Sequence, residues 1–173
     1  MDFLSTLKDL IPDYAKDVRL NLDAVIARSS LETADALGAA LAAAYAARSK
    51  PLTDAIRNSG ELSETDVNAA LGAAALMGMN NVWYPYVEMA GDPDLATQRA
   101  ELRMNAYATH GGVEKSRFEL FALAASIIGK CHFCIGSHYK LLREAGFTTQ
   151  QLRDVGRIAA VVGAAANVLS AEA

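Results

Sequence analysis

The sequence predicts an all-α fold, and three observations carry this prediction. Alanine supplies about one residue in five, and alanine loses least on entering a helix. Proline occurs only four times in the 173 residues, so long helices can form. Apolar residues recur with a helical period, and no segment shows a competing strand pattern. We therefore expect a single helical domain over residues 1–173.

The first half of the chain is expected to hold five helices. An opening helix ends at the turn Ile11-Pro12, and Pro51 suits the first turn of a later helix because an N–H there would lack a partner. Ser63 and Asp66 frame a segment that resembles a capping box. Pro85 is expected to end the helix that follows, because proline lacks the N–H that the helix needs. After the opening helix, the expected ranges are 13–27, 31–49, 51–60 and 64–84.

The second half begins with a connector over 91–112, where Gly-Asp-Pro and Gly-Gly sequences allow at most one helical turn. Three more helices are expected over 114–128, 131–145 and 149–169. Gly129 separates the first two, and Gly146 caps the second.

Segment 62–81 aligns without gaps on segment 147–166, an offset of 85 residues. This predicts a repeated helix-turn-helix unit whose copies pack on each other, a scaffold repeat over about 31–84 and a site-bearing repeat over about 114–169. The first copy has Ala46 and Ser49 where the second has Cys131 and Cys134. Chance similarity between two alanine-rich helices is the alternative.

The charge balance argues against nucleic-acid binding, because the formal net charge is −4 and the pI is near 5.3. The longest run of small apolar residues, 37–47, is about half the length of a membrane span. The first residues also lack the pattern of a signal peptide. We therefore expect a cytoplasmic protein without membrane contact.

The two cysteines, Cys131 and Cys134, carry the main functional signal. On a helix they share one face with His138, while His132 and Phe133 point elsewhere. A helix start at Cys131, beside Lys130, favours the thiolate form of its sulfur. A thiolate can attack a peroxide or a disulfide, and a second thiol three residues away can resolve the product, which makes a complete redox couple.

Glu119 lies in a strongly apolar segment and needs a partner if it is buried. His138 is one candidate, because a carboxylate that fixes one imidazole tautomer makes a better general base. Solvation of Glu119, or pairing with Arg117 or Lys115, is the alternative.

A zinc site is a competing interpretation of the same side chains. Cys131, Cys134, His138 and Glu119 have suitable ligand chemistry, which would make the protein a zinc-stabilised interaction module without catalysis. Covalent haem attachment is excluded, because Ile135 stands where the motif requires histidine.

Several blocks resemble the AhpD family of alkyl hydroperoxide reductases, within the carboxymuconolactone decarboxylase-like superfamily. They are residues 11–17, 20–22, 72–84, 102–105 and 118–120, together with the C-x-x-C-x-x-x-H segment. The resemblance implies a bacterial antioxidant enzyme with an all-α fold, usually a homotrimer, that reduces hydroperoxides. It also implies that the enzyme regenerates the peroxiredoxin AhpC, with electrons from a lipoylated dihydrolipoamide acyltransferase and no bound cofactor. A decarboxylase-like activity is an alternative, but nothing in it calls for a C-x-x-C pair.

The resemblance also implies roles for individual residues. Cys134 would form the sulfenic acid or the mixed disulfide, and Cys131 would donate a proton and resolve it, although the helix argument alone favours Cys131 as the more acidic thiol. Glu119 and His138 match the proton-relay positions. Family members can carry a relay histidine directly before the second cysteine, where this chain has Phe133. His132 lies one position earlier, so we expect it at most to tune the thiols.

Overall fold

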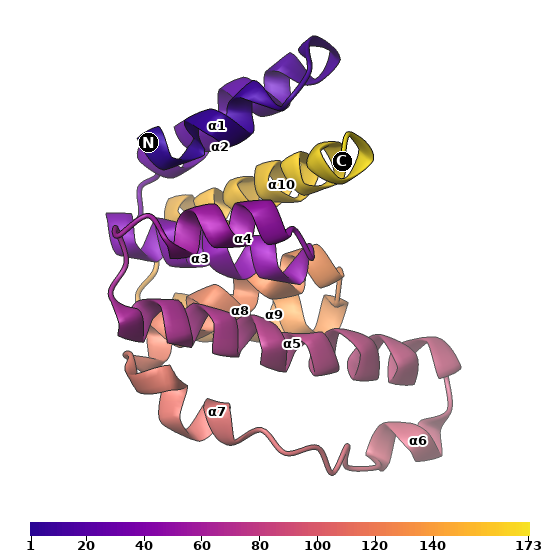
Figure 1. The fold of residues 1–173 in the computed structure, drawn as a ribbon. Coiled ribbons are helices and arrows are strands. Elements are labelled where there is room, and N and C mark those ends of the chain that lie inside the picture. The colour runs from indigo at the N-terminus through magenta and orange to yellow at the C-terminus, as the bar shows by residue number, and fades with distance from the viewer.

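The computed structural model describes Met1–Ala173 and contains helices and no strand, which confirms the all-α prediction (Figure 1). Most predicted helices are present with ends shifted by one to three residues. In chain order the elements are η1 (Asp2–Leu4), α1 (Ser5–Asp9), η2 (Asp13–Ala15), α2 (Lys16–Ala27), α3 (Thr33–Ala46), α4 (Lys50–Arg57), α5 (Glu64–Ala90), α6 (Pro93–Thr97), α7 (Asn105–Thr109), η3 (His110–Gly112), α8 (Lys115–Gly129), α9 (His132–Glu144) and α10 (Thr149–Ala171).

Helices α3 and α8 form the centre of the fold and pack directly on each other. Helix α5 covers one side of this pair, and α10 with α2 covers the other (Figure 1). Small residues allow the close approach: a Cβ on Gly38 would lie 2.3 Å from the Phe121 ring, so only glycine fits there. Glu119 lies on α8, so its buried side chain is held at the centre of the fold.

Helix α5 corrects one prediction, because it continues through Pro85 to Ala90 and ends at Gly91 in the left-handed conformation. Proline removes one helical hydrogen bond, but the flanking turns keep theirs. The extra turns carry exposed apolar side chains, among them Tyr86 and Met89.

The connector 91–112 is also more ordered than predicted. It holds the short helices α6 and α7 and the turn η3, instead of at most one helical turn. Gly111 lies against α5, where a Cβ would be 2.6 Å from the Ala69 Cα, at a backbone φ of 61° that also favours glycine. This contact anchors η3 and with it α7, which carries Tyr107, against α5.

The predicted internal repeat stays a prediction. Both units begin their long helix with a side-chain cap, Ser63 on α5 and Thr148 on α10, and both place a left-handed glycine before it, Gly60 and Gly146. The units pack on each other mainly through α5–α8, α3–α8 and α3–α10. Their long helices do not pack on each other, since α3 and α8 lie between them (Figure 1).

Helix α10 is long and apolar enough to cross a membrane by length and composition. Here it serves as a core helix, with Val155, Ile158 and Val162 fully buried. Its one buried carboxylate, Asp154, accepts hydrogen bonds from the Ser30 N–H and hydroxyl, each at 2.8 Å. Those bonds hold α10 to the start of α3.

Candidate active site

The C-x-x-C segment joins the central helix α8 to α9. Helix α8 ends at Gly129, Lys130 takes the left-handed conformation, and Cys131 is the N-cap of α9. The Cys131 sulfur accepts a hydrogen bond from the Cys134 N–H at 3.2 Å, so it meets the unpaired N–H groups of the helix start as predicted. The two sulfurs are joined in a disulfide.

Glu119 and His138 form a buried pair. The Glu119 Oε2 lies 2.6 Å from the His138 Nδ1, and the two side chains are 2% and 5% exposed. Arg117 binds Asp35 and Asp66 instead, which removes the alternative that it pairs with Glu119. Of the partners considered from the sequence, His138 is therefore the one that Glu119 contacts.

Tyr107 is a third member of this cluster, and sequence reasoning missed it. Its hydroxyl donates to the Glu119 Oε2 at 3.1 Å and lies 3.3 Å from the His138 Nδ1. Burial, followed by the negative charge of Glu119, raises the pKa of the Tyr107 phenol well above its usual range. The phenol therefore remains a hydrogen-bond donor throughout the physiological pH range.

Met77 closes the other side of the imidazole. Its sulfur lies 3.2 Å from the His138 Nε2, and its side chain is fully buried on α5. A thioether is a weak acceptor, so it holds the ring without competing strongly for the proton. Met77 was also missed, because nothing in the local sequence of α5 relates it to a histidine 61 residues away.

A cavity of about 190 Å³ opens beside the disulfide. Its lining residues are Asn80, Tyr84, Met104, Tyr107, Phe133, Cys134, Ser137 and His138. The Tyr84 and Phe133 rings stack with their centroids 4.2 Å apart, and Phe133 is 57% exposed. Cys134 lines the cavity, whereas Cys131 does not and lies 3.9 Å from the Asn80 carbonyl oxygen. Both cysteines are buried, at 0% and 3% exposure, but only Cys134 borders the cavity.

Known proteins resemble this chain over nearly its whole length. The Alkyl hydroperoxide reductase AhpD of Rhodospirillum centenum is 46% identical over 172 residues, which cover 98% of this chain and 92% of that protein. The AhpD of Hyphomonas neptunium is 44% identical, with 98% and 95% covered, and that of Maricaulis maris is 43% identical, with 98% of both covered. The chain belongs to the AhpD family. The sequence profile of the Carboxymuconolactone decarboxylase family matches residues 93–173, which include both cysteines, Glu119, His138 and Tyr107.

In this AhpD-family chain, His132 lies apart from the cluster. Its side chain is 80% exposed, and its Nδ1 lies 3.1 Å from the Glu88 Oε1. The candidate zinc ligands do not form a metal-binding group: no cluster of three or more His, Cys, Asp or Glu side chains is arranged to hold an ion. The cysteine sulfurs are bonded to each other instead.

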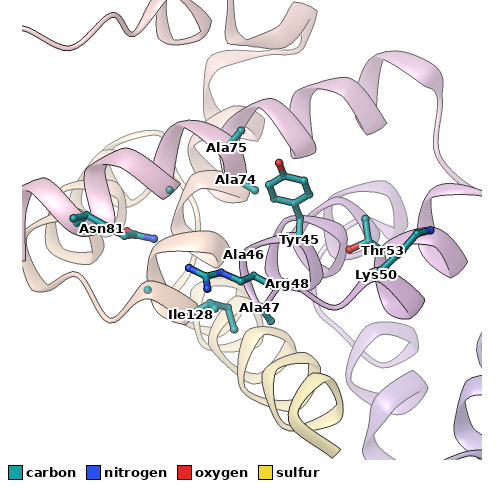
Figure 2. A pocket seen from close by; sticks show the side chains of 13 residues that line it. Tyr45, Ala46, Ala47, Arg48, Lys50, Thr53, Ala74, Ala75, Asn81 and Ile128 are labelled. Atoms are coloured by element: carbon teal, nitrogen blue, oxygen red, sulfur yellow. The ribbon is translucent and has the colours of Figure 1, made fainter. Parts of the chain in front are cut away.

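A second, larger groove lies on a different face of the AhpD fold, with a volume of about 870 Å³. Helices α3, α4 and α5 and the end of α8 form it, with Ala46, Ala74 and Ile128 among its apolar lining residues. Figure 2 shows the Arg48 side chain lying within this groove, with Asn81 beyond its guanidinium. Neither cysteine lines this groove, whereas Cys134 lines the smaller cavity.

Proposed function

We propose that this protein is a thiol-dependent alkyl hydroperoxide reductase that cycles Cys131 and Cys134 between dithiol and disulfide. One observation carries the proposal: the bonded cysteine pair starts a helix, with Cys134 opening to a cavity that His138 also lines. Membership of the AhpD family supports a peroxide-acting oxidoreductase.

The oxidative half-reaction follows from the position of the two sulfurs relative to the cavity. The Cys134 thiolate attacks one oxygen of the hydroperoxide, so an S–O bond forms, the O–O bond breaks, and the alcohol leaves after taking a proton. The Cys131 thiolate then attacks the Cys134 sulfenic acid, the S–O bond breaks, and water leaves as the disulfide forms. One hydroperoxide and two thiols thus give one alcohol, one water and one disulfide.

Proton transfer in these steps is assigned to His138 and Glu119. The imidazole accepts the proton that a thiol loses and returns it to the departing oxygen. Glu119 balances the charge of the protonated imidazole from 2.6 Å in a buried site, where such a charge is otherwise costly. His132 is exposed and bound to Glu88, which supports a tuning role at most.

The reductive half-reaction requires a dithiol from outside the chain. A dihydrolipoyl group attacks the disulfide, forms a mixed disulfide with Cys134, and leaves as the oxidised dithiolane while both cysteines return to thiols. The family resemblance supports a lipoylated dihydrolipoamide acyltransferase as this donor and the peroxiredoxin AhpC as the acceptor. It equally supports a cytoplasmic location and the absence of a bound cofactor.

The homotrimer is proposed to form through exposed apolar side chains along α5 together with Tyr45 at the end of α3, here called the α5 stripe. Its exposed side chains are Tyr45, Met79, Val82, Tyr86 and Met89, with exposed fractions of 44%, 39%, 69%, 51% and 80%. Apolar surface of this extent is typical of protein interfaces. Light scattering should therefore give three copies for the wild type and a smaller assembly for Val82→Glu.

The domain assignment remains part of the proposal: a single domain over 1–173, with a scaffold repeat at about 31–84 and the redox repeat at about 114–169. The buried α3–α8 contact joins the two parts, which supports a single cooperative unit.

The proposal is tested by thiol titration and peroxide consumption. Reduction with dihydrolipoamide should release two thiols per chain, and the reduced protein should consume cumene hydroperoxide. Cys134→Ser should abolish turnover, and Cys131→Ser should stop it after a single equivalent of peroxide. Inert thiols with one zinc per chain would instead support the zinc-stabilised module, and decarboxylation without peroxide turnover would support the decarboxylase-like alternative.

A further inference from the structure

Tyr107 has a placement that the proposed redox cycle does not use. Among the residues that line the 190 Å³ cavity, Tyr107 and His138 are the two that contact Glu119. Tyr107 lies on α7, outside the central α3–α8 pair, and η3 holds that helix near α5 and α8. Its phenol thus connects the open cavity to the buried carboxylate.

The hydrogen bonds around Glu119 are unequally shared. The Oε2 atom accepts from Tyr107 and pairs with the His138 Nδ1, whereas the buried Oε1 atom has no partner. A carboxylate buried in this way depends on few donors to remain charged, because burial alone favours the neutral form. Loss of one of two donors therefore removes a large share of its stabilisation.

We propose that Tyr107 is a positioning residue of the proton relay, whose hydroxyl keeps Glu119 ionised and aligned while His138 carries a proton. The inference rests on the proposed function of the site. Phe133, directly before Cys134, has no group that can donate or accept a proton and stacks on Tyr84 instead. Tyr107 supplies a hydroxyl to the relay from a different part of the chain.

Other ionisable groups lie around Glu119 and His138 and contribute to the pH dependence of turnover. Tyr84 and Cys134 lie across the cavity, and a pocket on the other side of Glu119 carries further charges. In that pocket the charged residues are Glu114, Lys115 and Glu144. Asp35 of α3 and Asp66 of α5 are both bound by Arg117, two residues before Glu119. The Tyr107→Phe substitution changes none of these groups, so a change in the pH profile reports on the hydroxyl alone.

The test compares Tyr107→Phe with wild type in cumene hydroperoxide turnover, with dihydrolipoamide as the reductant, between about pH 5 and 9. We expect kcat/KM to fall about tenfold to a hundredfold, the effect of losing one hydrogen bond to a buried charged group. The acid limb of the profile should move upward, because the carboxylate loses a donor that favours its charged form.

A matched control and a second readout separate this role from a purely structural one. Tyr139→Phe makes the same change one residue after His138, on an exposed ring without a hydrogen-bonded hydroxyl, and should leave rate and profile unchanged. Infrared difference spectra of Tyr107→Phe should show a protonated carboxylic acid at a pH where wild type shows none. Adding Glu119→Gln to Tyr107→Phe should remove that band.

Each result decides a different point. A slower Tyr107→Phe with an unshifted profile and no new acid band would overturn the positioning role. Wild-type rates in Tyr107→Phe, combined with an inactive Cys134→Ser, would overturn this inference and leave the proposed function intact. Full turnover by Cys134→Ser would overturn the proposed function itself.

Discussion

Replacing Gly129 by alanine perturbs the junction that presents the cysteines. A Cβ at this position would lie 2.1 Å from the Asn81 Nδ2 and 2.3 Å from its Cγ, well inside van der Waals contact. The Asn81 amide donates to the Ala125 carbonyl oxygen at 3.1 Å and so ties α5 to α8. The new methyl group must therefore displace this side chain and break its hydrogen bond.

The magnitude follows from two contributions. Forcing a methyl group into a filled space costs about 1 to 3 kcal/mol. The lost Asn81 hydrogen bond adds about 1 kcal/mol. We expect the free energy of unfolding to fall by about 2 to 4 kcal/mol, which for a domain of this size lowers Tm by roughly 4 to 16 °C.

Thermal unfolding followed by far-UV circular dichroism measures this effect, with Gly136→Ala as the matched control. Gly136 lies inside α9 with no atom within 4 Å of its Cβ position, so alanine there should stabilise the protein by about 0.5 to 1 kcal/mol. In an Asn81→Ala background, Gly129→Ala should lose about half of its cost, because the nearest clashing atoms are gone. An equal cost with and without the Asn81 side chain would refute the reasoning.

Three further predictions address the site and the stability of the fold. His138→Phe should slow peroxide turnover about a hundredfold or more, as expected for the loss of a general base. His132 is exposed, so His132→Phe should stay within a few fold of the wild-type rate in the same assay. Equal losses in the two variants would contradict the assignment of His138 as the base. Burial raises the pKa of the Asp154 carboxyl, but hydrogen bonds from Ser30 and the neighbouring arginines outweigh burial and hold the pKa below its usual range. The contribution of Asp154 to the free energy of unfolding is therefore present above about pH 4 and is lost as the pH falls through the lowered pKa of its carboxyl group. In urea unfolding, Asp154→Asn should lower the free energy of unfolding by about 2 kcal/mol at pH 7 and by less near pH 2. Lys130 has a backbone φ of 55°, so its replacement by glycine should raise the free energy of unfolding by about 0.5 to 1 kcal/mol. The gain would be measured as a higher guanidinium midpoint, and an unchanged midpoint would show that Lys130 is not strained.

The helices could be predicted because their signals are local. Ser63 and Thr148 cap their own helices, and alanine favours helix wherever it stands. The end of α5 could not be predicted in the same way, since the proline rule describes one lost bond and one clash at Pro85. Whether the chain continues depends on the turns on either side, which the rule does not weigh.

The candidate site also contains residues that local sequence patterns predict and residues that they do not. Spacing on a single helix predicts Cys131, Cys134 and His138 on one face. In the structure Cys131 is the N-cap of α9, and Cys134 and His138 lie within α9 and line the same cavity. Tyr107 and Met77 reach His138 across 31 and 61 residues, so only the packing of α7 and α5 against α8 and α9 brings them there. No local pattern marks such residues before the fold is known.

The difference between the two sulfurs shows how local and long-range effects combine. The N-cap position gives Cys131 the Cys134 N–H, which favours its thiolate, and the helix argument therefore favours it as the more acidic thiol. Packing against α5 also buries Cys131 completely near the Asn80 carbonyl, while Cys134 lines the cavity. In the proposed cycle Cys134, which borders the cavity, meets the peroxide, and Cys131, at the helix start, resolves the sulfenic acid. In that cycle, attack by the Cys131 thiol converts the Cys134 sulfenic acid into the disulfide and so competes with its further oxidation by peroxide.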